Sequence, residues 1–321
     1  MNSIVILGMH RSGTSAITRA LNLLGGDLGP DEDIGKYWES NVMRSQCDAL
    51  LSIFNGAWDC PGLMPLGWES SDAAAVVASG ASAAISRFGN PDVLLWKDPR
   101  ACLTLPFWRK HLGDDPIAII TYRHPEEVGA SLYTRNGLAP GLSFALWERY
   151  NSDALRYATG LRTVVFAYSD LIQNQSEIMT ELATTLGGWG VPLKDPATTD
   201  MELRSDQHHH HATKDFLHSS ATTSQRELFD ILEASRGVHE SFLPPTVMDP
   251  SPLSLELFEM RRQFHESRRE LWRARRDLRS LSGSRRKLLS RFIRPYPSAK
   301  DPLTRDTDDE VSPVTRRASP E

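Results

Sequence analysis

Cysteine is scarce in this chain of 321 residues, which contains only Cys47, Cys60 and Cys102. An odd number of cysteines without metal-ligand spacing predicts no disulfide framework, so we expect a reducing compartment, the cytoplasm. Long hydrophobic runs are lacking too, because the first apolar run covers only residues 4–7 and no later stretch approaches the roughly 20 apolar residues of a membrane span. The composition therefore predicts a soluble globular protein.

Acidic side chains are in slight excess overall, yet one segment reverses the sign. The net charge is -5, whereas residues 256–294 hold 13 Arg or Lys against 5 Asp or Glu, so the remainder of the chain carries -13. A basic segment on an acidic body predicts a separate interaction element, and no nucleic-acid partner is expected.

Short apolar runs alternate with amphipathic helical segments through the first 242 residues. Four of these runs have the length and composition of buried strands, at residues 3–7, 93–96, 117–122 and 163–166. Continuous apolar strands separated by helices favour a parallel sheet covered by helices. We therefore predict one α/β domain over residues 1–242, with a parallel sheet in three layers.

The pattern changes after residue 242. A proline-rich linker at 243–252 precedes a helix predicted over 253–294, in which apolar residues repeat in heptads. The a positions are Leu257, Phe264, Leu271, Leu278, Arg285 and Phe292, and the d positions are Met260, Ser267, Ala274, Leu281 and Leu288. This pattern predicts a coiled coil or a helix docked on a partner. Residues 295–321 are polar, charged and rich in proline, which predicts a disordered tail.

The first segment with chemical content is IVILGMHRSGTSAITRAL at residues 4–21, which predicts a strand, a small polar loop and a helix beginning near Thr14. Gly8 and Gly13 allow close approach of the backbone, and the free amides of the helix start favour a bound anion. Arg11 adds a charged, forked donor. Hydroxyl donors follow at Ser12, Thr14 and Ser15. The alternative is a strand-turn-helix junction that uses glycine and serine merely to turn.

The spacing of this loop, G-x-x-x-x-G-T-S, resembles a nucleotide triphosphate loop. Thr14 stands where that motif requires lysine. A kinase or NTPase that uses this loop would lack its phosphate-neutralising group, although such an enzyme remains the first alternative function.

A second segment, at residues 118–137, predicts a strand that delivers Arg123 at its end, followed by a helix that begins at Pro125. Ser131 lies eight residues after the arginine on the first two turns of that helix, and Arg135 lies one turn beyond it. An arginine at a strand end and a hydroxyl on the adjoining helix suit one phosphate. The alternative is that Arg123 pairs with the nearby Glu126 or Glu127 and Ser131 merely packs.

A third segment, VLLWKDPR at residues 93–100, predicts a buried strand that presents Lys97 at its carboxyl end, where ligands bind in open α/β sheets. A lysine at this place suits stabilisation of negative charge that develops in a transition state. Asp98 follows and is expected to orient Lys97 or Arg100. The alternative is a structural cluster of ion pairs.

Together these segments resemble the sulfotransferases that use 3′-phosphoadenosine 5′-phosphosulfate (PAPS), in particular their bacterial and Golgi-type members. The R-S-G-T-S core at Arg11 is similar to the 5′-phosphosulfate loop of that family, and R-H-P-x-x-V-x-x-S from Arg123 to Ser131 is similar to its 3′-phosphate site. The Lys-Asp-Pro at Lys97 and the FAYSDL turn at residues 166–171 also match. The resemblance covers roughly residues 1–190 and lacks the Arg-Lys-Gly segment of the cytosolic small-molecule enzymes.

The resemblance implies transfer of a sulfuryl group from PAPS to an acceptor hydroxyl, with Arg11 and Lys97 on the leaving phosphate. It implies donor binding by residues 11–15, Arg123, Ser131 and Arg135. The base is expected at Glu39, where the family often carries a glutamate. The alternatives are that Glu39 merely caps the following helix, or that Asp98 is the base.

The acceptor implied by the bacterial and Golgi-type resemblance is a carbohydrate or glycolipid of the cell envelope, with Tyr37 and Trp38 as a sugar-binding face. No metal is expected, because arginine and lysine carry the charge in sulfuryl transfer, and the run His208 to His211 is therefore set aside. His10 is expected to be a hydrogen-bonding partner in the loop and not the base.

The basic helix at 253–294 is expected to form a homodimer or to contact the inner face of the membrane peripherally. A second alternative function follows from it. In this case the α/β domain would be a non-catalytic scaffold, and the helix would carry the biological activity.

Overall fold

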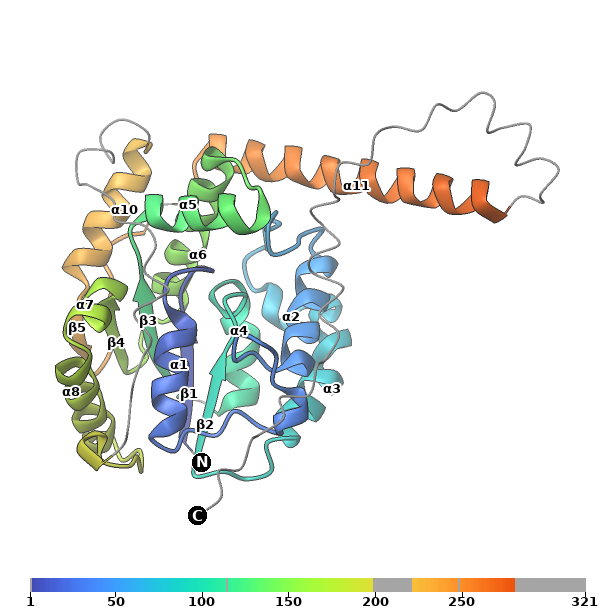
Figure 1. The fold of residues 1–321 in the computed structure, drawn as a ribbon. Helices are drawn as coiled ribbons and strands as arrows, with labels where there is room; N and C mark the ends of the chain where they lie inside the picture. The colour runs from blue at the N-terminus through green and yellow to red at the C-terminus, as the bar shows by residue number, and fades with distance from the viewer. Residues whose placement is uncertain (1, 114, 199–220, 248, 281–321) are drawn as a thin grey trace, which may run out of the picture.

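The structure is a computed structural model that describes residues 2–113, 115–198, 221–247 and 249–280. Its centre is a five-stranded sheet in the order β2-β1-β3-β4-β5 (Figure 1). The strands are β1 (Asn2–Leu7), β2 (Val93–Lys97), β3 (Ile117–Tyr122), β4 (Thr163–Ala167) and β5 (Gly237–His239). The first four pair in parallel, which confirms the predicted α/β class, while β5 runs antiparallel to β4 at the edge.

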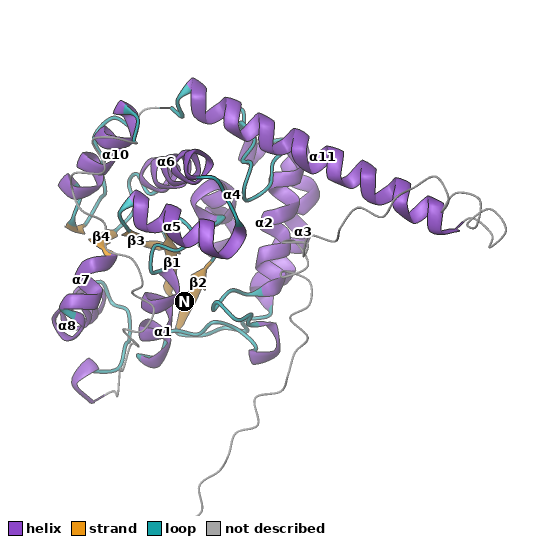
Figure 2. Cartoon of the chain, turned by 45° about the horizontal axis from the view of Figure 1, so that its top comes forward, coloured by secondary structure: helices purple, strands orange, loops and turns teal. Residues whose placement is uncertain are grey.

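Alternation along the strands separates two apolar faces, which gives the predicted three layers (Figure 2). In β1, Ile4 and Ile6 face one side, while Val5 and Leu7 face the other. The first side is covered by α1 (Thr14–Leu23), α7 (Tyr168–Gln173) and α8 (Gln175–Gly188). The second side is covered by α2 (Asn41–Ile53), α3 (Asp72–Ser86), α4 (Ala101–Leu112), α5 (Pro125–Asn136), α6 (Pro140–Tyr157) and α10 (Thr223–Ala234).

Short 3₁₀ turns complete the described elements, at Asp31–Asp33, Trp68–Ser70 and Pro196–Thr198. Helix α6 lies at the middle of the second layer and carries buried charges. Arg149 pairs with Asp153 at 2.7 Å, so these two charges neutralise each other inside the layer. Glu148 accepts hydrogen bonds from Ser224 and Gln225 at the start of α10, which fastens that helix to the layer.

The sheet topology also positions a site. Strand β1 lies between β2 and β3, so the chain segments that follow β1, β2 and β3 meet at one carboxyl edge. Ligands of open α/β sheets bind outside this edge, where the strand order reverses. All three motif segments of the sequence reach this edge, at Gly8, Lys97 and Arg123.

The C-terminal part of the described chain is one continuous helix, α11 (Pro252–Ser280), which begins one residue before its predicted start. Its first turns dock on α6, because Ser254 donates to Glu148 at 2.6 Å and Phe258 is buried in the second-side core. Its later turns extend beyond the α/β body (Figure 1). The division into a domain at 1–242, a linker at 243–252 and a helix at 253–294 stays a prediction. The run His208 to His211, the end of the helix and the tail at 295–321 lie outside the described residues.

No helix in the described ranges is both long enough and apolar enough to cross a membrane.

Candidate functional site

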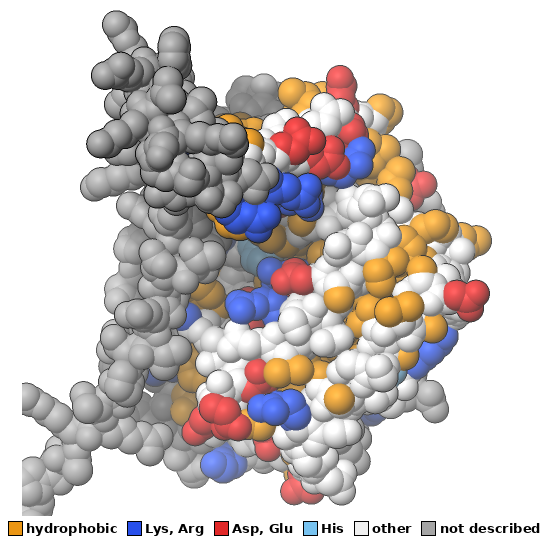
Figure 3. Space-filling view, turned by 90° about the vertical axis from the view of Figure 1, so that its right-hand side faces the viewer, with side chains coloured by type: hydrophobic (Ala, Val, Ile, Leu, Met, Phe, Trp, Pro, Cys, Tyr) orange, Lys and Arg blue, Asp and Glu red, His pale blue; other side chains and the backbone are white. Residues whose placement is uncertain are grey.

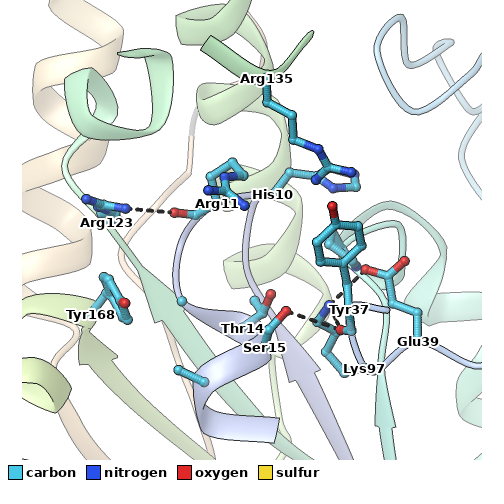
Figure 4. A pocket seen from close by; sticks show the side chains of 13 residues that line it. His10, Arg11, Thr14, Ser15, Tyr37, Glu39, Lys97, Arg123, Arg135 and Tyr168 are labelled. Carbon is cyan, nitrogen blue, oxygen red and sulfur yellow. Dashed lines mark hydrogen bonds and ion pairs between the residues drawn. The ribbon is translucent and has the colours of Figure 1, made fainter. Parts of the chain in front are cut away.

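A pocket opens at the carboxyl edge of the sheet, where the three motif segments converge (Figure 4). Its lining carries four cationic side chains and one carboxylate. The lining residues are His10, Arg11, Gly13, Thr14, Ser15, Ala16, Tyr37, Glu39, Lys97, Pro99, Arg123, Arg135 and Tyr168. Such an excess of positive charge in a concave site favours a ligand with several negative charges.

The loop between β1 and α1 is shaped by backbone conformations that few residues adopt. Gly13 precedes α1 with a φ of 86°, and a Cβ there would lie 2.0 Å from the Tyr168 ring. Arg11 has a φ of 72°, which is uncommon for a residue with a side chain. Because Gly13 offers no side-chain cap, the first amides of α1 are left to face the pocket. The loop therefore has the geometry of an anion cradle.

The Arg11 side chain joins the loop to helix α5. Its Nε donates to the Ser131 hydroxyl at 2.7 Å, so residues 120 positions apart are in direct contact. Burial lowers the pKa of Arg11, and the charges of Arg135 and Arg123 lower it further. Arginine nevertheless stays charged at neutral pH. Three guanidinium groups this close are stabilised when an anion binds between them.

Arg123 follows β3 and lies at the rim of the same pocket. Its Nε donates to Glu127 at 2.6 Å, so the pairing with Glu127 that the sequence offered as an alternative is present. Its guanidinium also lies over the Tyr168 ring, 5.2 Å from the centroid, and its Nη1 is 3.5 Å from the Arg11 carbonyl oxygen. The Arg123 charge is therefore held in place beside the loop.

Lys97 reaches the pocket from the end of β2 and is almost completely buried. Its Nζ donates to Glu39 Oε1 at 2.8 Å and to the Tyr37 carbonyl oxygen at 2.7 Å. Burial lowers the pKa of Lys97, and the nearby Glu39 carboxylate opposes that shift. Tyr37 and Glu39 thus line the pocket beside Lys97, and the single carboxylate of the lining is paired with the lysine.

Glu39 does not cap the helix that follows it. That cap is Ser40, whose hydroxyl accepts a hydrogen bond from the Met43 amide at the start of α2. Asp98, the alternative base, is buried outside the lining and accepts hydrogen bonds from the Arg100 amide and guanidinium. The geometry therefore leaves Glu39 as the carboxylate that faces the pocket.

Other predicted site residues divide between the lining and its supports. Thr14 and Ser15 line the pocket, and Ser15 Oγ donates to the Tyr37 carbonyl oxygen at 3.1 Å. Arg135 lines it too, with its guanidinium 4.3 Å from the Tyr37 ring centroid. Ser12 and Ser131 are buried outside the lining, and the Ser12 hydroxyl has no hydrogen-bond partner in the described part of the chain. Ser131 reaches the site through Arg11.

His10 belongs to the pocket wall, and although it was predicted to be a hydrogen-bonding partner in the loop, its Nε2 is buried without a hydrogen-bond partner among the described residues. Its ring packs edge-on against Trp58 at 4.9 Å between centroids. Burial lowers the pKa of His10 well below its usual value, and the positive charge of Arg100 acts in the same direction. A neutral imidazole therefore lies next to the cationic groups. Tyr168 was also missed as a lining residue, but its FAYSDL motif could have indicated it.

One group of side chains among the described residues has the composition of a metal site, namely Asp59, Cys60 and His265. It lies outside the pocket lining. Arg261 already donates to Asp59 at 2.7 Å, so the charge that a cation would neutralise is paired with a guanidinium. This cluster instead attaches helix α11 to Asp59 through Arg261 and His265, and we call these contacts the Asp59 clamp.

Comparison with solved structures finds distant likenesses. A sulfotransferase domain from the curacin biosynthetic pathway is 14% identical with a TM-score of 0.40, and the match covers 81% of this chain and 96% of that one. A sulfotransferase domain from a Synechococcus olefin synthase is 19% identical with a TM-score of 0.32, covering 81% and 94%. No family model and no curated protein sequence matches the chain. At these identities and TM-scores the likenesses assign no function. Any inference about function therefore depends on the side chains of the pocket.

Proposed function

We propose that this protein is a sulfotransferase that transfers a sulfuryl group from PAPS to an acceptor hydroxyl. The observation that carries the proposal is the convergence of three motif residues, Arg11, Lys97 and Arg123, on one pocket at the carboxyl edge of the sheet. PAPS carries negative charge at both its phosphosulfate and its 3′-phosphate. The cationic lining and the loop amides suit such a ligand.

The donor is proposed to bind with its 5′-phosphosulfate in the loop at residues 11–15. The glycine at position 13, where a Cβ would collide with Tyr168, leaves the backbone free to approach a phosphate. Arg123 and Ser131, supported by Arg135, are proposed to hold the 3′-phosphate. This arrangement lets Arg11 contact both ends of the donor, because it already bonds to Ser131.

In the proposed reaction the acceptor oxygen attacks sulfur in line, and the bond between sulfur and the bridging phosphate oxygen breaks. The acceptor proton passes to Glu39, and the negative charge left on the phosphate is stabilised by Lys97, Arg11 and the loop amides. Lys97 and Glu39 are paired at 2.8 Å. We expect the Lys97 ammonium to turn toward the bridging oxygen when the donor binds, which frees the Glu39 carboxylate to accept the proton.

The acceptor is proposed to be a carbohydrate or glycolipid of the cell envelope. Tyr37, next to the paired Lys97 and Glu39, lines the pocket and places an aromatic ring near the reacting groups, with the Arg135 guanidinium over this ring. Trp38 instead packs against the first-side core. The three free, buried cysteines support the proposal of a cytoplasmic enzyme, which would reach a lipid acceptor from the inner face of the membrane.

The test is product formation. The purified protein is incubated with PAPS and a mixture of cell-envelope glycolipids and oligosaccharides, and mass spectrometry follows adenosine 3′,5′-bisphosphate and sulfated product. We expect both to appear together and to disappear in Lys97→Met. Magnesium-dependent hydrolysis of ATP, with no turnover of PAPS, would instead favour a kinase or NTPase. Absence of both activities in a folded protein would favour the scaffold.

A further inference from the structure

Helix α11 carries an apolar stripe that the α/β body leaves uncovered from Met260 to Ala274. The stripe lies at the a and d positions of the heptads, where Met260, Phe264 and Leu271 are 60%, 48% and 52% exposed. Ser267 and Ala274 continue the same positions and are exposed as well. Large apolar side chains exposed at a and d positions are typical of a helix that has a partner.

Docking on the body uses only the first stripe residue, Leu257, which is partly buried against the second-side core. The docked side chains include Ser254, Phe258 and His265, which contact α6, the core and Asp59 respectively. Each of them is six residues before a stripe residue, and six residues correspond to about 120° around an α-helix. One side of α11 therefore contacts the body, while the a and d positions from Met260 to Ala274 stay exposed.

The charges that flank the stripe are separated by sign. The e positions are Arg261, Arg268 and Arg275, and the g positions are Glu256, Gln263 and Glu270. In a parallel pair of helices, each g residue faces the e residue of the next heptad on the other helix. Glutamate would then meet arginine in the first and last of these pairs, and glutamine would meet arginine in the middle one.

We infer that α11 binds a second copy of this chain as a parallel, in-register coiled coil. An antiparallel pair would place e against e, which sets arginine against arginine, so the charges favour one orientation. Arg261 is already paired with Asp59 of its own chain. The pair between Glu270 of one chain and Arg275 of the other therefore contributes most to the orientation, and both side chains are exposed.

The same charges argue against an anionic membrane as the partner. An amphipathic helix bound to such a surface carries basic residues on both flanks of its apolar face. Here one flank is acidic, at Glu256 and Glu270. In the upper part of Figure 3, Lys and Arg side chains lie directly beside Asp and Glu side chains.

The experiment is sedimentation equilibrium of the full chain at low and high salt. We expect a dimer that persists at 1 M salt, because apolar a and d contacts are not screened. The variant with Phe264→Asp and Leu271→Asp should be a monomer with an unchanged circular dichroism spectrum. Trp272→Asp is the matched control: Trp272 is 61% exposed but lies outside the a and d positions, so the dimer should remain.

A second set of variants tests whether the two α11 helices are parallel and in register. Ser267→Cys at a d position should form an interchain disulfide under mild oxidation, whereas Arg269→Cys on the outer face should not. Glu270→Arg should weaken the dimer, and adding Arg275→Glu in the same chain should restore it. A monomeric parent protein, or a dimer insensitive to the substitutions at Phe264 and Leu271, would overturn the inference. Binding to anionic vesicles by a protein that stays monomeric would replace the second copy with a membrane.

Discussion

Replacing Glu39 by glutamine would leave Lys97 as a buried ammonium without its carboxylate. Lys97 has 2% of its side chain exposed and donates to Glu39 at 2.8 Å, so water cannot take over the role of the lost charge. Breaking a buried ion pair by removing one partner typically costs about 3–5 kcal/mol. The stability of the folded chain should therefore fall in Glu39→Gln.

The loss of stability has an upper limit, because Lys97 can lose its proton and become neutral. An ordinary lysine with a pKa of about 10.4 loses its proton at a cost of about 4 kcal/mol at pH 7.5 and about 1.2 kcal/mol at pH 9.5. The Tyr37 carbonyl oxygen still accepts one hydrogen bond from Nζ, which lowers the cost further. We expect Glu39→Gln to lose about 2–4 kcal/mol at pH 7.5 and about 1 kcal/mol at pH 9.5.

The direction in which stability changes with pH follows from proton linkage. Burial lowers the pKa of Lys97 in the folded chain, so the unfolded chain holds the proton more strongly. Stability therefore rises with pH over the window between the lowered pKa and the ordinary one. Glu39 opposes the lowering of the Lys97 pKa. Without Glu39 the pKa of Lys97 falls further, so the pH range over which stability rises becomes wider.

The assay is urea unfolding of the parent and Glu39→Gln at both pH values, followed by tryptophan fluorescence. Glu32→Gln is the control, since Glu32 is 76% exposed and 3.7 Å from Arg87, and such a surface pair contributes about 0–1 kcal/mol. Adding Lys97→Met to Glu39→Gln should recover most of the lost stability. A loss in Glu39→Gln no larger than that of the control, or equal at the two pH values, would refute the reasoning.

Three further predictions concern binding, turnover and the clamp on α11. Lys97→Met should lower kcat with PAPS by a factor of about 10²–10³ while the dissociation constant for the spent donor changes much less, measured by steady-state kinetics and calorimetry. Arg123→Ala should weaken spent-donor binding about 10–100-fold and Ser131→Ala by less than about 10-fold, because the arginine contact is charge-assisted; equal binding by both variants and the parent would remove the 3′-phosphate assignment. Asp59→Ala should destabilise the chain by about 2–4 kcal/mol and speed hydrogen exchange at the start of α11, whereas Asp249→Ala, 90% exposed, should do neither.

The Asp59 clamp should also depend on pH in a defined direction. Burial acts to raise the pKa of Asp59, but the hydrogen bonds and charges of His265 and Arg261 outweigh it and leave the pKa below its ordinary value. Its contribution to stability is therefore present above about pH 4 and is lost as the pH falls through the lowered pKa. Hydrogen exchange in α11 that accelerates already near neutral pH would contradict this assignment.

The sheet was predictable because its strands are continuous apolar runs. The strand at 117–122 has the bounds expected from the sequence, and the other three predicted strands differ by one residue at one end. Strand β5 was missed, since three largely exposed residues carry no alternation that distinguishes them from a loop. The parallel order of the first four strands explains why motifs far apart in sequence meet at one edge.

The sequence predicted which residues line the pocket better than it predicted which of them contact one another. Lys97 was expected at the end of a strand, but its pairing with Glu39 joins residues 58 positions apart and depends on the path of the chain between them. The contact of Gly13 with Tyr168 likewise requires the end of β4 to lie beside the loop. Local spacing identifies which residues reach the edge of the sheet, and it cannot specify which of them touch.

Helix α11 illustrates the same distinction. The heptads predicted a continuous helix with one apolar seam, and the structure contains that helix to Ser280. The second contact face could not be read from the heptads, because Ser254 and His265 are polar and their partners, Glu148 and Asp59, lie more than 100 residues away.

Calorimetry with adenosine 3′,5′-bisphosphate, the spent donor, is the most direct test of the central claim that the pocket binds PAPS. We expect the bisphosphate to bind without magnesium, and adenosine 5′-monophosphate, which lacks the 3′-phosphate that Arg123 would hold, to bind more weakly. In Arg123→Ala the difference between the two nucleotides should shrink. No measurable binding of the bisphosphate to the folded parent protein, or equal binding of the two nucleotides, would contradict the account.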